Sequence, residues 1–301
     1  MILLIGPQQD PMIEAVWEEL QSRGLRFRRI DVHDLPATVR FGFIEPGGTG
    51  YVRFPDDELL PVEAVTSVFH RVGFANFEVF EDYTDQEVEY VNAQCQAALF
   101  AYLNFSRALV VNRPVASGSN ASKPFQIEKI REHGFRVPDT LVTTLPQSAA
   151  EFYQRHEGRV IYKSVSYVRS IVTGMTQDDL ERLDTVRNCP VQLQERVEGT
   201  DIRVHVVGDG AAFASIITAQ ESDYRYDRQS RIEPGEIPPE IRDRCFALTR
   251  ALGLSVAGID LRRTGEGEFY CFEVNPSPAF SWYEARTGQP IASAVVDLLA
   301  G

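Results

Sequence analysis

The start of the chain alternates between short apolar runs and one helical stripe. Met1–Ile5 is a continuous apolar run that ends at a Gly-Pro pair, as buried strands often do. In Met12–Gln21 the apolar residues recur at helical spacing, and Leu25–Val32 alternates again as a strand. A strand, a helix and a strand in this order predict a parallel sheet with a helix over it.

The following elements complete a small N-terminal domain that we place at 1–114. They are a hairpin at Phe41–Phe54 turning at Pro46-Gly47-Gly48, strands at Val65–Phe69 and Ala108–Val111, and a helix at Glu87–Leu103. His70-Arg71 closes one of these strands and either faces a cleft or has a structural role. Val115–Ser122 is made largely of small and polar residues, so we take it as the boundary to the next domain.

A second region, at 115–190, begins with a helix at Lys123–His133. Pro124 suits its first turn, and Ser122 is a candidate cap. Arg159–Ser164 alternates as a strand and places Lys163 on its inward-leaning face, which is unusual because lysine is rarely buried without a partner. The polar stretch Val165–Gly174 then predicts a mobile loop.

The third region, at 191–301, is rich in strands. We expect strands at Val191–Val197, Ile202–Val207 and Ala211–Ile217, and helices at Pro239–Leu252 and Ile291–Leu299. Ser222–Pro239 is a long polar excursion between them.

The stretch Gly258–Asn275 predicts a β-hairpin with a glycine-rich turn near Glu266-Gly267. In that register Asp260 lies directly across from Glu273, and Asn275 shares the face of Glu273 because side chains alternate along a strand. The residues expected to point the other way, into a core, are Ile259, Leu261, Phe272 and Val274.

Two carboxylates that face each other destabilise a sheet unless a cation lies between them. A hard divalent cation takes oxygen ligands and leaves positions open for phosphates, so Asp260, Glu273 and Asn275 form a candidate Mg²⁺ site. The alternative is an ordinary solvated hairpin face.

The composition limits the possible partners. The chain has 301 residues, an apolar fraction of 44% and a charged fraction of 24%, as expected for a soluble globular protein. Its net charge of -13 argues against nucleic acid or an anionic membrane as a general partner. The four cysteines include no C-x-x-C, and no apolar run reaches the length of a membrane span or signal peptide. We therefore expect a cytoplasmic protein with reduced thiols.

Five short motifs stand in a fixed order along the chain. They are Lys123 at a helix start, Lys163 on a strand, the segment Gln194-Glu195-Arg196-Val197, Asp201-x-Arg203, and Asp260 followed by Glu273-x-Asn275. In this order and spacing the chain resembles the ATP-grasp superfamily of carboxylate–amine ligases over nearly its whole length. The resemblance implies an α/β chain in which two α+β subdomains, at 115–190 and 191–301, grip ATP behind a small parallel α/β domain.

The resemblance also assigns roles to single residues. Lys123 and Lys163 would neutralise ATP phosphates, although surface salt bridges are the alternative. The implied roles are adenine binding by the backbone of Gln194, Glu195, Arg196 and Val197, ribose binding by Asp201, and coordination of Mg²⁺, or Mn²⁺ instead, by Asp260, Glu273 and Asn275. Arg203, with Lys163, would act in catalysis by gripping a phosphate or the acyl phosphate.

Within the superfamily the chain is most similar to peptide ligases, especially those that cross-link ribosomal peptides (microviridin-type or graspetide ligases). The matching features are V-N-R-P at 111–114, V-P-D-T-L-V-T-T at 137–144, S-D-Y-R at 222–225 and S-W-Y-E-A-R-T-G-Q-P-I at 281–291. This branch would place Tyr224 and Arg225 near the substrate, with Ser277 as a further substrate contact. Unlike many members, the chain has no glycine run after Lys163.

The implied reaction forms an amide or ester on a peptide through an acyl phosphate, and it needs no side-chain nucleophile. Two other hypotheses stay open: a ligase for amino acids or other small molecules, and a nucleotide-binding regulatory module without turnover. A homodimer is a further option.

Overall fold

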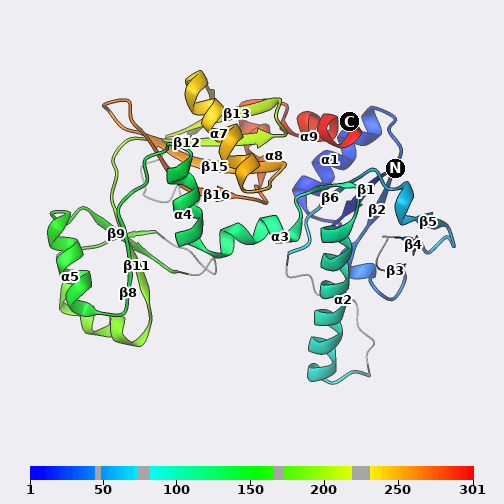
Figure 1. Cartoon of the computed structure of the whole chain (residues 1–301), viewed down its shortest axis with the longest axis horizontal. Helices are drawn as coiled ribbons and strands as arrows, with labels where there is room; N and C mark the ends of the chain where they lie inside the picture. Colours follow the sequence, from blue (N-terminus) through cyan, green and yellow to red (C-terminus); the bar gives the residue numbers. More distant parts are fainter. Residues whose placement is uncertain (45–48, 74–81, 166–171, 219–230) are drawn as a thin grey trace.

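The computed structural model describes residues 1–44, 49–73, 82–165, 172–218 and 231–301. Figure 1 shows three regions. A sheet with helix α5 lies at one end, a larger sheet with α7 and α8 lies in the middle, and the N-terminal sheet with α2 lies at the other end.

The N-terminal region is built on a parallel sheet, as predicted. Its strands run in the order β2-β1-β6-β7. Their bounds are β1 (Ile2–Ile5), β2 (Phe27–Ile30), β6 (Ser67–His70) and β7 (Leu109–Val111), with helices α1 (Pro11–Ser22) and α2 (Asp85–Phe105). Helix α1 starts at Asp10, whose side chain accepts hydrogen bonds from the N–H groups of Met12 and Ile13. Alternation of apolar runs with one amphipathic helix therefore produced the expected strand-helix-strand unit.

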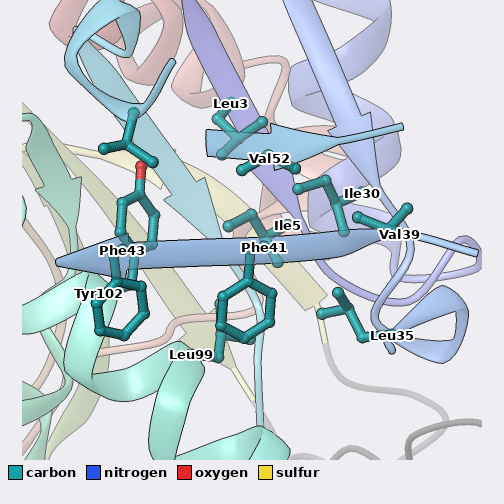
Figure 2. A pocket seen from close by; sticks show the side chains of 11 residues that line it. Leu3, Ile5, Ile30, Leu35, Val39, Phe41, Phe43, Val52, Leu99 and Tyr102 are labelled. Carbon is teal, nitrogen blue, oxygen red and sulfur yellow. The ribbon is translucent and has the colours of Figure 1, made fainter. Parts of the chain in front are cut away.

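A small antiparallel sheet of β3 (Arg40–Ile44), β4 (Thr49–Arg53) and β5 (Leu59–Pro61) covers one face of this domain. The expected hairpin is confirmed, and its turn at 46–48 lies outside the described residues. Figure 2 shows a small apolar cavity between this sheet, the parallel strands and α2, lined by residues such as Leu3, Phe41, Val52 and Tyr102. The cavity lies within the hydrophobic core of the domain.

A second sheet, in the order β10-β9-β11-β8, lies at the end of the molecule opposite the N-terminal sheet (Figure 1). Its elements are β8 (Thr140–Thr143), β9 (Val160–Lys163), β10 (Thr173–Gly174) and β11 (Val191–Glu195), with α5 (Pro146–Arg155) and α6 (Gln177–Glu181). Helices α3 (Pro114–Ser117) and α4 (Lys123–Glu132) precede this sheet in the chain, and α4 packs against the third sheet. Thr173 and Gly174 were expected in a loop but pair with β9, because they return along the free edge of that strand. Residues 166–171 of the expected loop lie outside the described part. Ser122 makes no side-chain cap to α4.

The third sheet is antiparallel, in the order β14-β13-β12-β15-β16. Its elements are β12 (Thr200–Val207), β13 (Ala211–Thr218), β14 (Arg231–Gly235), β15 (Val256–Arg263) and β16 (Phe269–Asn275), with α7 (Pro239–Ala251), α8 (Phe280–Thr287) and α9 (Ile291–Ala300). Strand β14 falls in the predicted polar excursion. It was missed because an edge strand exposes most of its side chains, and only Ile232 is buried. Short 3₁₀ turns occur at Val32–Asp34, Val62–Ala64, Gly118–Ala121 and Leu183–Asn188.

One hydrophobic core joins the N-terminal sheet to the third sheet. It contains Ile2 and Leu4 from β1 together with Val207 of β12, Val256 of β15 and Val295 of α9. Helices α1 and α9 lie side by side over this junction (Figure 1). The first and last parts of the chain therefore pack as one unit.

Candidate functional site

The hairpin of β15 and β16 carries the carboxylates at the centre of the site. Asp260 pairs with Glu273, and Gly258 pairs with Asn275, which confirms the predicted register at this end. Beyond Asp260 the register shifts, and Leu261 pairs with Cys271. Cys271, and not the predicted Phe272, therefore fills the core, where it is 1% exposed.

The neighbouring strand β12 adds further polar side chains to the same face. Asp201, Arg203 and His205 alternate along it, and they pair with Arg262, Asp260 and Gly258 of β15. The residues between them face a core under α4 and α7, and Val204 and Ile259 there are fully buried. The sheet thus has one apolar face and one face of charged and polar groups.

Each carboxylate of the hairpin is neutralised by a cation from a different element. The Arg203 Nη1 atom lies 2.6 Å from Asp260 Oδ1. The Lys123 Nζ atom, at the start of α4, lies 3.4 Å from Glu273 Oε2. The first residue of a helix lies at the positive end of the helix dipole, where an anion and not a lysine is favoured. This placement suits a group that binds an anion.

Arg203 occupies a tightly defined position. Its side chain is 6% exposed, and its guanidinium carbon lies 5.9 Å from the ring centroid of Tyr283 on α8. A Cβ atom at Gly258 would lie 2.2 Å from Arg203 Nη2. Gly258 is therefore the residue that gives the guanidinium room.

Burial raises the pKa of Asp260 above its usual value. The Arg203 guanidinium opposes this change, whereas the nearby Glu273 carboxylate adds to it. The two carboxylates thus lie close together, although their side chains are 36% and 30% exposed, and a multivalent cation would reduce their repulsion.

On the second sheet, strands β9 and β11 bring Lys163 and Gln194 together. Lys163 is 9% exposed, and its Nζ atom lies 3.4 Å from Gln194 Oε1. Gln194 donates in turn to Thr140 Oγ1 over 3.0 Å. The lysine is therefore buried with a polar partner, as its position on the strand required.

The segment predicted to hold adenine is partly engaged within the fold. The N–H groups of Glu195 and Arg196 donate to the carbonyl groups of Asp139 and Arg159 at 2.8 Å and 2.9 Å. Within the described part of the chain, the N–H of Val197 has no such acceptor. Adenine binding by the backbone of this segment stays a prediction.

Arg262 links this segment to the polar face of the third sheet. It donates from Nη1 to the Val197 carbonyl and from Nε to Asp201 Oδ1, both over 2.7 Å. Asp201 thus has an arginine partner that the sequence argument did not foresee. Ribose binding by Asp201 stays a prediction.

The donor set of the hairpin fits Mg²⁺. Two facing carboxylates and one carboxamide supply oxygen donors only, which is what a hard cation requires. Among the described residues there is no cluster of three or more His, Cys, Asp or Glu side chains. A cation held here would therefore need Asn275 as a third protein donor, and this role stays a prediction.

Asn275 is the last residue of β16, and the loop that follows it is held by Arg71 of the N-terminal domain. The Asn275 Oδ1 atom accepts a hydrogen bond from the Ser277 N–H over 2.8 Å. Ser277 does not present its hydroxyl freely, because both that hydroxyl and its carbonyl accept from Arg71. Tyr224 and Arg225, the other predicted substrate contacts, lie outside the described residues.

Besides Arg262, no role in the site was assigned from the sequence to Gln126, Tyr283 or His205. Gln126 of α4 donates to the Val274 carbonyl over 2.8 Å and accepts from its N–H over 2.9 Å, which fixes α4 against the outer edge of β16. Tyr283 covers Arg203, and His205 packs edge-on against the same ring. Gln126 lies three residues after Lys123, so both side chains fall on the same side of α4. This spacing was the sequence signal that could have identified Gln126.

A family model described as the RimK-like ATP-grasp domain matches residues 123–299. A probable alpha-L-glutamate ligase of Pseudoalteromonas translucida is 28% identical over 200 residues, covering 63% of this chain and 66% of that protein. A ribosomal protein bS6--L-glutamate ligase of Escherichia coli is 28% identical over 197 residues, covering 62% and 65%. The chain thus spans just under two thirds of the length of these two relatives.

Solved structures are similar over the whole chain. The ATP-grasp ligase PsnB with a minimal precursor is 27% identical with a TM-score of 0.85, covering 99% of this chain and 97% of that one. The same ligase with a phosphomimetic precursor variant, Mg and ADP has a TM-score of 0.83. The macrocyclase MdnC of Microcystis aeruginosa MRC, solved with its precursor peptide MdnA, is 23% identical with a TM-score of 0.86, covering 100% and 99%. The expected fold class is confirmed.

In the described ranges of the chain, none of the helices is long and apolar enough to cross a membrane.

Proposed function

The chain belongs to the RimK-like ATP-grasp family, and we propose that it is an ATP- and Mg²⁺-dependent ligase that joins a carboxylate to an amine or hydroxyl of a peptide. The observation that carries the proposal is the pair of facing carboxylates, Asp260 and Glu273, each held by a cation that a phosphate could take over.

In the proposed first step, a substrate carboxylate attacks the γ-phosphorus of ATP, forming an acyl phosphate and releasing ADP. An amine or hydroxyl then attacks the acyl carbon, forms the amide or ester, and expels phosphate. Both steps move negative charge between oxygen atoms without a side-chain nucleophile, so catalysis consists of positioning and charge stabilisation.

The residues of this chain divide those tasks. Lys123 and Lys163 hold phosphate oxygens, and Arg203 offers its planar fork to the transferred phosphoryl group. Asp260, Glu273 and Asn275 hold the divalent cation, which, when bound, neutralises charge on the phosphates. Mn²⁺ would suit the same oxygen donors.

The carboxylates and cations of the site are matched one to one, with Arg203 on Asp260 and Lys123 on Glu273. A metal held by the carboxylates would leave these two cations for phosphate oxygens. Each charge would then keep a partner of opposite sign.

Three observations favour a peptide as the substrate. The chain aligns over nearly its full length with PsnB, solved with a precursor, at 27% identity. A relative is named for adding glutamate to ribosomal protein bS6. The peptide-ligase motifs at 111–114 and 281–291 also occur in this chain. We further propose that the protein acts in the cytoplasm, where ATP is supplied, and that a homodimer is compatible with this role.

The test is a coupled assay for ADP release with purified protein, ATP and MgCl₂. One panel contains peptides that carry Asp or Glu together with Lys, Ser or Thr, and a second panel contains free amino acids. Mass spectrometry of the peptides reports loss of one water for an internal cross-link, or addition of one residue.

ADP release with peptides, accompanied by one of these mass changes, supports the proposal. Turnover with free amino acids alone would replace it with a small-molecule ligase. Tight nucleotide binding with no ADP release in either panel would indicate a regulatory module and overturn it.

A further inference from the structure

Three neighbouring parallel strands of the N-terminal sheet end beside the open end of the β15–β16 hairpin. Strands β1, β6 and β7 are adjacent, and the carboxyl ends of parallel strands share one edge of a sheet. The segments after these strands contribute Asp10, Arg71 and Asn112, which contact the hairpin or one another. The last residue pair of the hairpin at this end is Gly258 with Asn275.

Arg71 holds the loop that follows Asn275. Its Nη1 atom donates to the Ser277 carbonyl over 2.8 Å and also to the Ser277 hydroxyl. Its Nε atom lies 3.1 Å from Asp10 Oδ2, the carboxylate that caps α1. Ser277 in turn donates its N–H to Asn275 Oδ1 over 2.8 Å. A continuous chain of contacts therefore runs from α1 to the amide of Asn275.

Asn112 holds both strands of the same hairpin. Its Nδ2 atom donates to the carbonyl groups of Pro276 and Val256, over 2.5 Å and 2.6 Å. Its Oδ1 atom accepts from the N–H groups of Ser255 and Val256. The side chain is 5% exposed, so these bonds are made away from water.

From these contacts we infer that Arg71, supported by Asp10 and Asn112, is a positioning residue for the cation site of the ligase. Strand ends fray unless their groups are paired, and Asn275 is the last residue of β16. A carbonyl oxygen has two lone pairs, so Asn275 Oδ1 can accept from Ser277 and still offer one lone pair to a cation. The N-terminal domain thus fixes the orientation of the third oxygen donor.

This inference rests on the proposed function, because it concerns the same site. Outer partners that orient the residues of a metal site change metal affinity by about 10–100-fold when they are removed. Loss of Arg71 would release the Ser277 loop while leaving Asp260 and Glu273 in place. We therefore expect weaker binding of the cation and nucleotide together, with little change in binding of nucleotide alone.

Isothermal titration calorimetry with ADP, in MgCl₂ and separately in EDTA, tests this on the full-length chain. For Arg71→Ala we expect the dissociation constant of ADP in MgCl₂ to rise about tenfold, and that in EDTA to stay within about twofold. Arg71→Lys, which retains a donor toward Ser277, should recover part of the loss.

The chain offers a matched control in Arg23. This arginine joins α1 to α9 through Asp297, over 2.5 Å, and Ser293, so it also links the N-terminal region to the last helix. It makes no contact with the Ser277 loop. Arg23→Ala should leave both dissociation constants unchanged, and thermal melting of all variants separates local effects from unfolding.

The outcomes are distinct. An Arg71→Ala protein that binds ADP in MgCl₂ as tightly as the wild type overturns the inference, as does an equal loss in Arg23→Ala. Wild-type protein that binds ADP in neither buffer would instead overturn the proposed function.

Discussion

The two faces of the five-stranded sheet differ in almost every physical property, although they alternate residue by residue. On one face Val204, Ile259 and Val274 are fully buried beneath α4 and α7. On the other, Asp260 and Glu273 face each other and are stabilised by cations from other elements. The apolar face packs the sheet against the helices, whereas the polar face presents carboxylates and cations that a charged ligand could contact.

This contrast separates stability from activity within one hairpin. Removing a charge from the polar face lowers repulsion and leaves the core intact. Removing a methyl group from the apolar face leaves the charges in place but opens a cavity. Substitution of a polar-face residue should therefore lower activity with little loss of stability. Substitution of its apolar-face neighbour should lower stability with little loss of activity.

The largest effect is expected for Glu273→Gln. The change keeps the shape of the side chain but removes one of the two carboxylates, so charge stabilisation of the phosphates is lost. We expect ADP release to fall by about 10²–10³-fold, the size seen when one preorganised electrostatic group is removed. Steady-state kinetics measures this loss, and circular dichroism checks the fold.

The thermal midpoint of Glu273→Gln should stay close to that of the wild type, because Asp260 loses a like-charged neighbour while Lys123 loses its ion-pair partner. Activity within a few-fold of wild type would contradict the role of Glu273.

Ile259→Ala tests the opposite face one residue away from Asp260. The side chain is fully buried, so its truncation should lower the free energy of unfolding by about 3 kcal/mol. Urea denaturation measures the change. At temperatures where the variant is folded, ADP release per molecule should stay within about twofold, and a large loss of turnover would show that the faces are not independent.

Acid should destabilise the protein through two histidines, the fully buried His205 and the partly buried His70. Burial is the main cause that lowers the pKa of His70 to about 4, and it also lowers the pKa of His205, which packs against Tyr283. The unfolded state takes up protons near pH 6.5, so stability is full above that pH and is lost as the pH falls toward 4.

For His70 alone, the free energy of unfolding should fall by about 2 kcal/mol between pH 7.5 and pH 5. Urea denaturation at the two pH values measures this loss. His70→Asn should reduce it, whereas the exposed His33→Asn should not, and an equal pH dependence in both variants would refute the assignment.

The smallest effect is expected for Gly258→Ala. A new Cβ would displace the end of the Arg203 side chain, which costs little stability but moves the guanidinium. We expect kcat to fall about tenfold, as for a misplaced charge-stabilising group. The matched control is Gly210→Ala, since a Cβ there meets nothing within 4 Å. Equal kcat values in the two variants would show that Arg203 tolerates the shift.

Local sequence pattern determined much of this molecule. The parallel start of the chain, the hairpin and the pairing of Asp260 with Glu273 all follow from alternation and turn residues, which act between near neighbours. The same signals failed where alternation was interrupted: at the register shift after Asp260, Cys271 and not Phe272 points into the core. They also failed for β14, because this edge strand is polar.

Contacts between residues far apart in the chain were decided only by the tertiary structure. Pairing of Lys123 with Glu273, stacking of Tyr283 on Arg203, and attachment of Arg71 to Ser277 join elements separated by tens to hundreds of residues. The periodicity of the sequence cannot predict such pairs of residues, because each pair depends on how whole sheets and helices pack. The sequence therefore specified which chemical groups the site contains, and packing specified which of them meet.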